Sequence, residues 1–521
     1  MDAAISPADP KARLARIDQA LRTRRVDAGL PDARALTSEF PGYIDGWLAL
    51  ARCLQMAGDH AGMREALGAA LKLDPASPLA RLMDAEALVH HGRVKEAASA
   101  FRAMRADADN DANWLARIGE GLGQCGLPEA ALDCFDQALS LKPGAAELHY
   151  ARATHLIAVG RLDEAEQAFD TAIRRAPHDY DAYYNRSTLR TQTPARNHVD
   201  ELRRMLRVPH RTPLAPVQLN FALAKELEDL GRDAESFEAL KAGADARRAM
   251  MRYDVRGDVA TMDAIAKRFD KAWLDAAGAG VEADGPVFIL GLPRSGSTLT
   301  DRILSAHSEI ESLGELNDFP LALTGLCRQA GGKAQLIDAA AALDPAALGT
   351  AYLERLAGRR GNARLFIDKA PANFLYIGLI AAALPGARII HVHRDPMDNV
   401  YSLYKALFRM GYPYSYDFAD LAAYMQAKDR LMTHWHAVLP GRIHDVRYED
   451  IIADQDGETR RLLDAVGVAF EPACLDFHRN ASPSATHSAA QVRQPLYSSS
   501  VGLWRRYAEQ LAPLARQLGV S

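Results

Sequence analysis

The chain has 521 residues, of which 48% are apolar and 25% are charged. At about 150 residues per domain this length exceeds one compact unit, and the composition is that of a folded protein, which excludes wholesale disorder. The formal net charge is −5, so the chain as a whole lacks the strongly basic character of nucleic-acid or membrane-surface binders. Its five cysteines have no CxxC spacing, which predicts free thiols in a reducing compartment and neither a disulfide framework nor a zinc site.

The start of the chain has no apolar segment typical of a secretory signal. The most apolar stretch, residues 375–392, is interrupted by Pro385 and Arg388. A membrane span needs about 20 apolar residues, so this stretch does not qualify. We therefore expect a cytoplasmic protein with neither a nucleic-acid nor a membrane partner.

The N-terminal half repeats with a period of 34 residues. Glycine recurs at this spacing, followed at fixed offsets by alanine, an aromatic residue and proline: Gly58, Gly92, Gly126 and Gly160; Ala97, Ala131 and Ala165; Phe101, Phe135 and Phe169; Pro75, Pro143 and Pro177. This pattern resembles the tetratricopeptide repeat. The resemblance implies pairs of antiparallel helices that bury their apolar faces only when they stack.

The repeats predict an α-helical solenoid over residues 8–245. The pattern decays after Pro177, and Pro194 stands where the next glycine is expected. Residues 246–284 then indicate a helical linker. Two roles for the solenoid remain open: it recruits an acceptor or a protein partner, or it serves as a platform or dimerisation element.

The pattern changes after the linker. Short apolar runs at 287–292, 363–368 and 387–393 alternate with helical segments. Such runs are typical of buried parallel strands. Residues 285–515 are therefore predicted to form an α/β domain with a P-loop-like parallel sheet.

The first strand leads into a loop with phosphate-binding spacing. Gly291 and Gly296 are separated by four residues, and Ser297 and Thr298 follow. Backbone N–H groups at the start of the next helix would face an anion. A nucleotide triphosphatase needs a lysine where this chain has Ser297, so the loop favours a phosphate ligand other than ATP.

This loop resembles the 5′-phosphosulfate loop of sulfotransferases, enzymes that use 3′-phosphoadenosine 5′-phosphosulfate (PAPS) and release adenosine 3′,5′-bisphosphate (PAP). The matching sequence is PRSGST, followed by LxxxILxxH. The resemblance implies that the loop residues bind PAPS: Arg294, Ser295, Gly296, Ser297 and Thr298.

A second anchor of this resemblance is RIIHVHRDP and the helix after it. In the family, an arginine and a serine at the places of Arg394 and Ser402 hold the 3′-phosphate. A guanidinium offers an anion a planar fork, which agrees with that role. The alternative is a structural arginine paired with Asp395 or Asp398.

The spacing after the first loop is similar to the protein-tyrosine sulfotransferase branch. Glu315 lies 21 residues after Arg294, where that branch has its general base. The resemblance further implies that Arg294 and Lys369 stabilise charge on the transferred group, that Ser488 assists and that Tyr448 contacts the nucleotide. No metal is expected, because side chains supply the positive charge.

One position departs from that branch: the lysine before the late tryptophan is Leu503. Arg493, Arg505 or Arg506 would take over its phosphate contact. The acceptor stays open between peptide tyrosine, a saccharide hydroxyl and a small phenol. Two other functions also remain: a P-loop kinase or ATPase, and a repeat scaffold with an inactive C-terminal domain.

Overall fold

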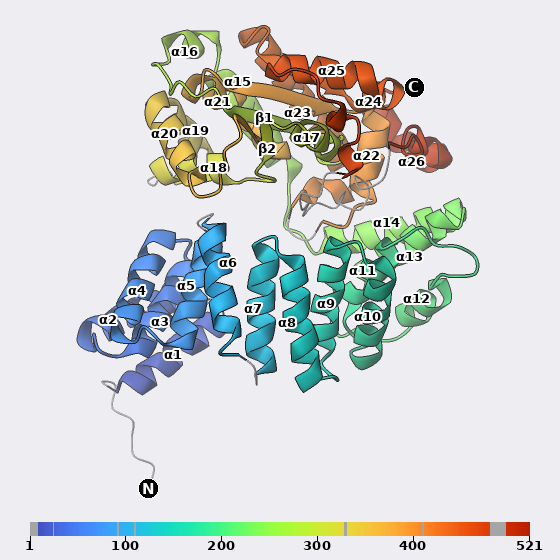
Figure 1. Cartoon of the computed structure of the whole chain (residues 1–521). Coiled ribbons are helices and arrows are strands. Elements are labelled where there is room, and N and C mark those ends of the chain that lie inside the picture. The colour runs from blue at the N-terminus through green and yellow to red at the C-terminus, as the bar shows by residue number, and fades with distance from the viewer. Residues whose placement is uncertain are drawn as a thin grey trace. The chain divides into compact units, whose positions relative to one another are not determined.

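The computed structural model describes residues 9–23, 25–90, 93–108, 111–327, 331–408, 411–479 and 496–520 (Figure 1). The chain divides into two compact units, Met1–His155 and Leu156–Ser521. Among the described residues, no helix combines the length and apolar character needed to cross a membrane. The predicted limits of the solenoid, the linker and the C-terminal domain stay predictions.

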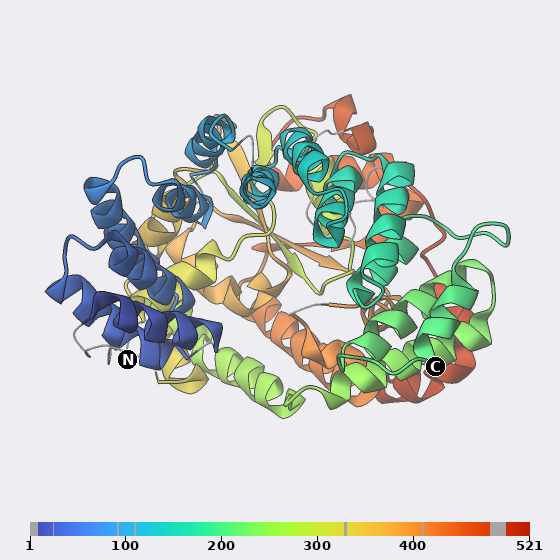
Figure 2. The same ribbon diagram turned by 90° about the horizontal axis from the view of Figure 1, so that it is seen from below.

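The first unit is a row of antiparallel helices, as the repeats predict (Figures 1 and 2). Their bounds are α1 Pro10–Arg22, α2 Val26–Glu39, α3 Ile44–Met56, α4 His60–Leu73, α5 Pro78–His90, α6 Val94–Arg105, α7 Ala112–Gln124, α8 Pro128–Leu141 and α9 Ala146–Ala158, the last of which continues into the second unit. Gly58 and Gly126 have φ of 75° and 76°, a conformation that favours glycine and turns the chain between the two helices of a repeat. The recurring aromatic position is core, because Phe101 is fully buried.

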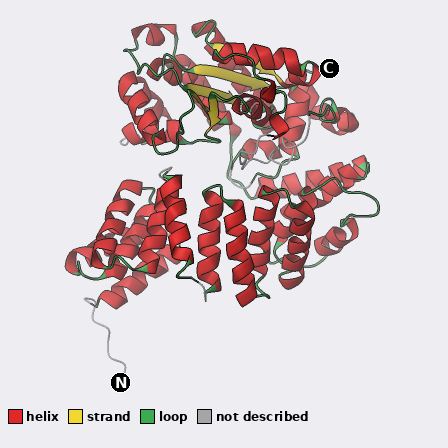
Figure 3. Cartoon of the chain, viewed as in Figure 1, coloured by secondary structure: helices red, strands yellow, loops and turns green. Residues whose placement is uncertain are grey.

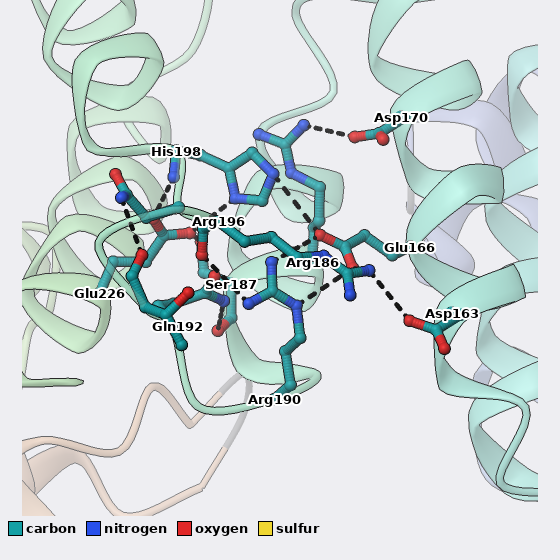
Figure 4. Close-up of polar contacts among 12 residues, drawn as sticks. Asp163, Glu166, Asp170, Arg186, Ser187, Arg190, Gln192, Arg196, His198 and Glu226 are labelled. Atoms are coloured by element: carbon teal, nitrogen blue, oxygen red, sulfur yellow. Dashed lines mark hydrogen bonds and ion pairs between the residues drawn. The ribbon is translucent and has the colours of Figure 1, made fainter. Parts of the chain in front are cut away.

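The second unit begins with further helices. Their bounds are α10 Leu162–Arg175, α11 Tyr180–Thr188, α12 Val199–Leu206, α13 Ala215–Asp229, α14 Asp233–Ala249, α15 Val255–Arg268 and α16 Lys271–Ala276. Where the repeat pattern fails, between α11 and α12, ion pairs hold the chain (Figure 4). The half-buried Arg190 donates to the buried carboxylate of Glu166 at 2.9 Å, and Arg196 pairs with the same carboxylate. Polar contacts thus take the place of the missing repeat at this point.

Glu226 is the other buried acid of this network. Its carboxylate is fully buried and accepts hydrogen bonds from Ser187 Oγ at 2.7 Å and from the backbone N–H and Nδ1 of His198 at 2.5 and 2.9 Å. Removing a buried acceptor leaves its donors unpaired away from water.

We expect Glu226→Ala to lower the free energy of unfolding by about 3 kcal/mol, because Ser187 and His198 lose their acceptor. Urea unfolding of the full chain measures this change. Glu238→Ala on α14 is the control, because Glu238 is exposed, and it should unfold like the wild type. Equal unfolding midpoints for the two variants would contradict the structural role of Glu226.

The centre of the second unit is a five-stranded parallel sheet (Figure 3). Its strand order is β2-β3-β1-β4-β5, with bounds β1 Pro286–Gly291, β2 Ile310–Ser312, β3 Leu365–Lys369, β4 Arg388–His393 and β5 Ile443–Arg447. The three predicted apolar runs form β1, β3 and β4, the three inner strands. The predicted α/β parallel-sheet class is therefore confirmed.

Helices cover both faces of the sheet. Their bounds are α17 Ser297–Ser305, α18 Asp318–Leu326, α19 Lys333–Ala341, α20 Pro345–Leu356, α21 Ile377–Ala383, α22 Pro396–Tyr404, α23 Phe418–Val438, α24 Tyr448–Ala453, α25 Gln455–Val466 and α26 Ala508–Leu518. Val287 and Ile289 of β1 share one core cluster with α17, α24 and α25. Phe288, which points to the opposite face, packs on Phe319 of α18 and Tyr352 of α20. The sheet is thus buried on both sides, which explains the continuous apolar runs.

Candidate active site

The loop between β1 and α17 is tightly constrained. Gly291 has φ of 145°, and a Cβ there would lie 2.2 Å from the carbonyl oxygen of Val392. Gly296 has φ of 108°, and a Cβ there would lie 2.7 Å from Cδ2 of Tyr448. Only glycine satisfies both positions. The loop therefore presents the N-terminus of α17 as an anion-binding end.

The second anchor follows β4. Arg394 lies over the ring of Tyr448, 4.8 Å from its centroid, and donates a hydrogen bond from Nη2 to the carbonyl oxygen of Ser500. Its guanidinium is also 3.9 Å from Glu449 and 4.0 Å from Asp398. Arg394 thus has acids near it, as the structural alternative expected. Of the two acids named there, Asp398 is at ion-pair distance. Glu449 is a second acid, which was not predicted. Arg394 also lines a cavity.

The two anchors meet in one place. β1 and β4 are hydrogen-bonded neighbours. The strands that follow them in the chain, β2 and β5, lie at opposite edges of the sheet. In open α/β sheets, ligands bind at the carboxyl ends of two such strands. Arg294 Nε donates to Ser402 Oγ at 3.2 Å. This hydrogen bond joins the first predicted loop directly to the second.

A cavity of about 310 Å³ lies at this junction. It is lined by seven of the predicted nucleotide-binding residues: Arg294, Gly296, Ser297, Thr298, Arg394, Ser402 and Tyr448. Leu503, the position of the missing lysine, also lines it. Four other lining side chains were not predicted to bind the nucleotide: Asp229, Tyr401, Tyr497 and Asp398, the last of which was expected only as a structural partner of Arg394.

The donor set of this cavity fits a phosphorylated nucleotide. Burial lowers the pKa of the Arg294 guanidinium, and the positive charge of Arg394 lowers it further. Two close guanidinium groups repel each other, and an anion between them offsets that repulsion. Ser297, Thr298 and Ser402 add hydroxyl donors, so the cavity suits a ligand with more than one phosphate.

Ser295 differs from its loop neighbours. It lines a second cavity of about 430 Å³, together with His391, His436 and Asp445. Its Oγ is buried and has no hydrogen-bond partner among the described residues. The side chain of Ser295 therefore does not line the first cavity, and its predicted role in nucleotide binding stays a prediction.

The second cavity contains a histidine–carboxylate cluster. His391 Nδ1 lies 2.7 Å from Asp445 and His436 Nε2 lies 3.2 Å from it, and one ligand atom from each residue falls within 4.8 Å of the others. Burial lowers the pKa of His391 to about 4, so this imidazole is neutral at neutral pH. Lys428 and Arg447 line the same cavity, and their positive charges oppose a cation there.

Glu315 and Lys369, predicted from different segments, lie side by side. Lys369 ends β3 with its side chain 1% exposed, and its Nζ donates to Glu315 Oε1 at 2.5 Å. Glu315 precedes α18 and is half exposed. No hydrogen bond among the described residues uses Glu315 Oε2. Neither residue lines the first cavity, so their catalytic roles stay predictions.

Two predicted residues, Ser488 and Arg493, lie outside the described residues. Of the other candidates to replace the missing lysine, Arg505 lies over the ring of Trp504 and Arg506 pairs with Asp233. Neither arginine lines the cavity. The predicted role of Arg493 in replacing the lysine therefore stays a prediction.

Asp368, beside Lys369, is a fully buried carboxyl. It accepts hydrogen bonds from Tyr352 at 2.9 Å and Asn373 at 3.3 Å. Burial raises its pKa from 3.8 to about 7. The carboxyl is then protonated in the folded protein and ionised in the unfolded chain between these two values, so unfolding releases a proton.

We expect the free energy of unfolding of the wild type to fall by about 1.4 kcal/mol per pH unit between pH 4 and pH 7. This fall is measured relative to Asp368→Asn, whose side chain does not titrate. The stabilising effect of the protonated carboxyl is complete below pH 4 and is lost as the pH rises through 7. Urea unfolding of both proteins at pH 5 and pH 7 measures it. Parallel stability profiles would show that Asp368 is ionised in the folded protein.

Comparison with known proteins shows which families this chain is similar to. The sequence profile of the sulfotransferase family matches residues 286–472, and tetratricopeptide-repeat profiles match residues 64–112 and 126–189. An uncharacterized protein of Aquifex aeolicus (strain VF5) is 28% identical over 372 residues, which cover 69% of this chain and 48% of that protein. This chain thus spans about half the length of that relative.

Two further proteins are similar to part of this chain. A putative protein-tyrosine sulfotransferase of Caenorhabditis briggsae is 23% identical over 252 residues, which cover 45% of this chain and 88% of that protein. The sulfotransferase domain of the Synechococcus PCC 7002 olefin synthase aligns at 20% identity with a TM-score of 0.34, covering 46% of this chain and 97% of that chain. The profile matches show tetratricopeptide repeats in the N-terminal part of the chain and a domain of the sulfotransferase family at residues 286–472.

Proposed function

We propose that this protein transfers a sulfuryl group from PAPS to an acceptor hydroxyl. The observation that carries the proposal is the single cavity lined by both predicted phosphate anchors, with Arg294 hydrogen-bonded to Ser402 across it. A cavity of about 310 Å³ lies within the usual size range of small-molecule sites. One nucleotide with phosphates at both ends would engage both anchors.

Different residues would bind the two phosphate-bearing ends of PAPS. The N-terminus of α17, with Ser297 and Thr298, would bind the 5′-phosphosulfate. Arg394 and Ser402 would bind the 3′-phosphate, and Tyr448 would contact the nucleoside. PAPS supplies the sulfuryl group and a stable leaving group, so the protein needs to supply position, positive charge and a base.

The pair of Glu315 and Lys369 fits the chemical step. An acceptor oxygen forms a bond to sulfur while the bond between sulfur and the 5′-phosphate oxygen breaks, and the acceptor proton passes to a base. Glu315 Oε2 would take that proton, because Lys369 holds Oε1. Arg294 and Lys369 would stabilise negative charge on the transferred group and on the leaving oxygen.

The acceptor we propose is a hydroxyl of a peptide tyrosine or a saccharide, delivered in the cytoplasm with the help of the repeats. The similarity to a putative protein-tyrosine sulfotransferase supports the first of these. Repeat solenoids bind extended peptides on their concave face, which is compatible with a protein acceptor or partner.

Calorimetry with PAP and with Mg-ATP tests the donor class, and incubation with PAPS and three acceptors tests the reaction: a tyrosine peptide, a saccharide and a small phenol. We expect PAP binding, PAP release and an acceptor mass gain of about 80 daltons, for one added SO₃. Binding of Mg-ATP without binding of PAP would overturn the proposal in favour of a kinase or ATPase.

A further inference from the structure

The nucleotide cavity is bordered by a helix that precedes the sulfotransferase-family domain in sequence. Asp229, the last residue of α13, lines the cavity. Beyond it, Arg506 pairs with Asp233 at the start of α14 and donates to the backbone oxygen of Glu228. The views in Figures 1 and 2 agree in placing α13 and α14 next to the C-terminal segment. This helix pair is therefore fixed to the wall of the cavity.

Glu228 holds a cation at the cavity. Lys405 lines the cavity, and its Nζ donates to both carboxylate oxygens of Glu228, at 2.9 and 3.1 Å. Lys405 follows Ser402 by three residues at the end of α22, so the two side chains share one helix face. Lys405 Nζ also lies over the ring of Tyr401, 5.2 Å from its centroid. An ammonium has three donors, and hydrogen bonds to side chains or backbone within the described part of the chain use two of them.

Lys405 supplies a positive charge to the cavity in which Leu503 stands in the place of the family lysine. Both residues line the same cavity, and neither described arginine that was considered as a replacement does so. A cation one helical turn from Ser402 is suited to the phosphate that Ser402 would bind. Lys405 of the α22 end is therefore a candidate for this role beside Arg493, which lies outside the described residues.

Asp229 brings a negative charge to a cavity that otherwise suits phosphates. Lys225 Nζ at 2.6 Å and the backbone N–H of Gln192 at 2.8 Å both donate to its Oδ2. No hydrogen bond among the described residues uses Oδ1. A carboxylate oxygen repels phosphate and accepts hydrogen bonds from neutral donors, and in PAP such donors are the amine of the base and the ribose 2′-hydroxyl.

We propose that the end of α13 completes the nucleotide pocket: Glu228 positions Lys405 on the 3′-phosphate, and Asp229 accepts a hydrogen bond from the nucleoside. This inference rests on the proposed function, because it requires a 3′-phosphorylated nucleotide in the cavity. Glu228 is a positioning residue, since it acts through Lys405.

Calorimetry with PAP and with adenosine 5′-monophosphate, which lacks the 3′-phosphate, tests the first part. Lys405→Met should weaken PAP binding about tenfold and leave the monophosphate unaffected, and Lys405→Arg should restore PAP binding. Glu228→Gln should weaken PAP binding, and combining it with Lys405→Met should add nothing further. Additive losses, or equal losses for both nucleotides, would overturn the positioning role.

Two analogues of PAP test the second part: inosine 3′,5′-bisphosphate lacks the amine, and 2′-deoxyadenosine 3′,5′-bisphosphate lacks the hydroxyl. We expect one of them to bind the wild type about tenfold more weakly than PAP, and that difference to disappear in Asp229→Ala. The matched control is Glu238→Gln, an exposed acid on α14 outside the cavity, which should keep the difference. Analogue differences that are unchanged in Asp229→Ala would overturn the role of Asp229.

PAP binding by the wild type separates failure of the proposed function from failure of this inference. If the wild type does not bind PAP, the proposed function fails and takes this inference with it. If the wild type binds PAP and the α13 variants behave like the control, only the inference fails.

Discussion

Replacing Glu315 with glutamine should lower kcat about 10²- to 10⁴-fold, the usual contribution of a general base. The amide keeps the shape of the side chain and cannot take the acceptor proton. Glu315 does not line the nucleotide cavity, so the Kd for PAP should stay within about twofold of the wild type. Steady-state PAP release and calorimetry measure the two quantities separately.

Glu309→Gln is the matched control. Glu309 is a half-exposed acid close in sequence, and it pairs with an arginine, Arg364, as Glu315 pairs with Lys369. The control should keep the wild-type kcat. Equal activity of Glu315→Gln and Glu309→Gln would remove Glu315 from the reaction and leave its ion pair with a structural role alone.

Arg394→Ala should weaken PAP binding about 10- to 100-fold, because a charge-assisted contact to phosphate is worth about 1.5 to 3 kcal/mol. Adenosine 5′-monophosphate has no 3′-phosphate, so its affinity should change little. The ratio of the two affinities, measured by calorimetry, therefore isolates the contact to the 3′-phosphate from any general loosening of the cavity.

Arg388→Ala provides the comparison on the same strand. Arg388 begins β4, at the opposite end from Arg394, and pairs with Asp284. The Arg388→Ala variant should keep the wild-type ratio of the affinities for PAP and adenosine 5′-monophosphate. If Arg394→Ala weakened both nucleotides equally, the guanidinium would serve to hold Tyr448 and Ser500 in place, and the structural alternative would be correct.

The inner part of the fold is predictable from the sequence because its strands are buried on both faces. Continuous apolar runs at 287–292, 363–368 and 387–393 are typical of strands that are covered on both faces of a parallel sheet. The two edge strands were missed. β2 is only Ile310–Ser312, and β5 places the half-exposed Asp445 and an arginine among its apolar residues, so neither has a distinctive pattern.

The candidate site was predictable to the extent that it resides in local motifs. The glycine spacing of the first loop and the position of Arg394 after a strand each determine their local geometry, and the parallel sheet brings them together. Asp229 and Glu228 lie in no such motif. Asp229 lines the cavity and Glu228 pairs with Lys405, and both positions depend on how α13 packs in the second unit. The direction of the Ser295 side chain likewise depends on close packing around Gly291, which spacing alone does not specify.

The structure of the full chain in complex with PAP tests the central claim most directly. The account predicts one nucleotide in the cavity, with its 5′-phosphate at the N-terminus of α17 and its 3′-phosphate within hydrogen-bond distance of Arg394 and Ser402. Phosphates bound elsewhere, or a nucleotide that reaches only one of the two anchors, would contradict it.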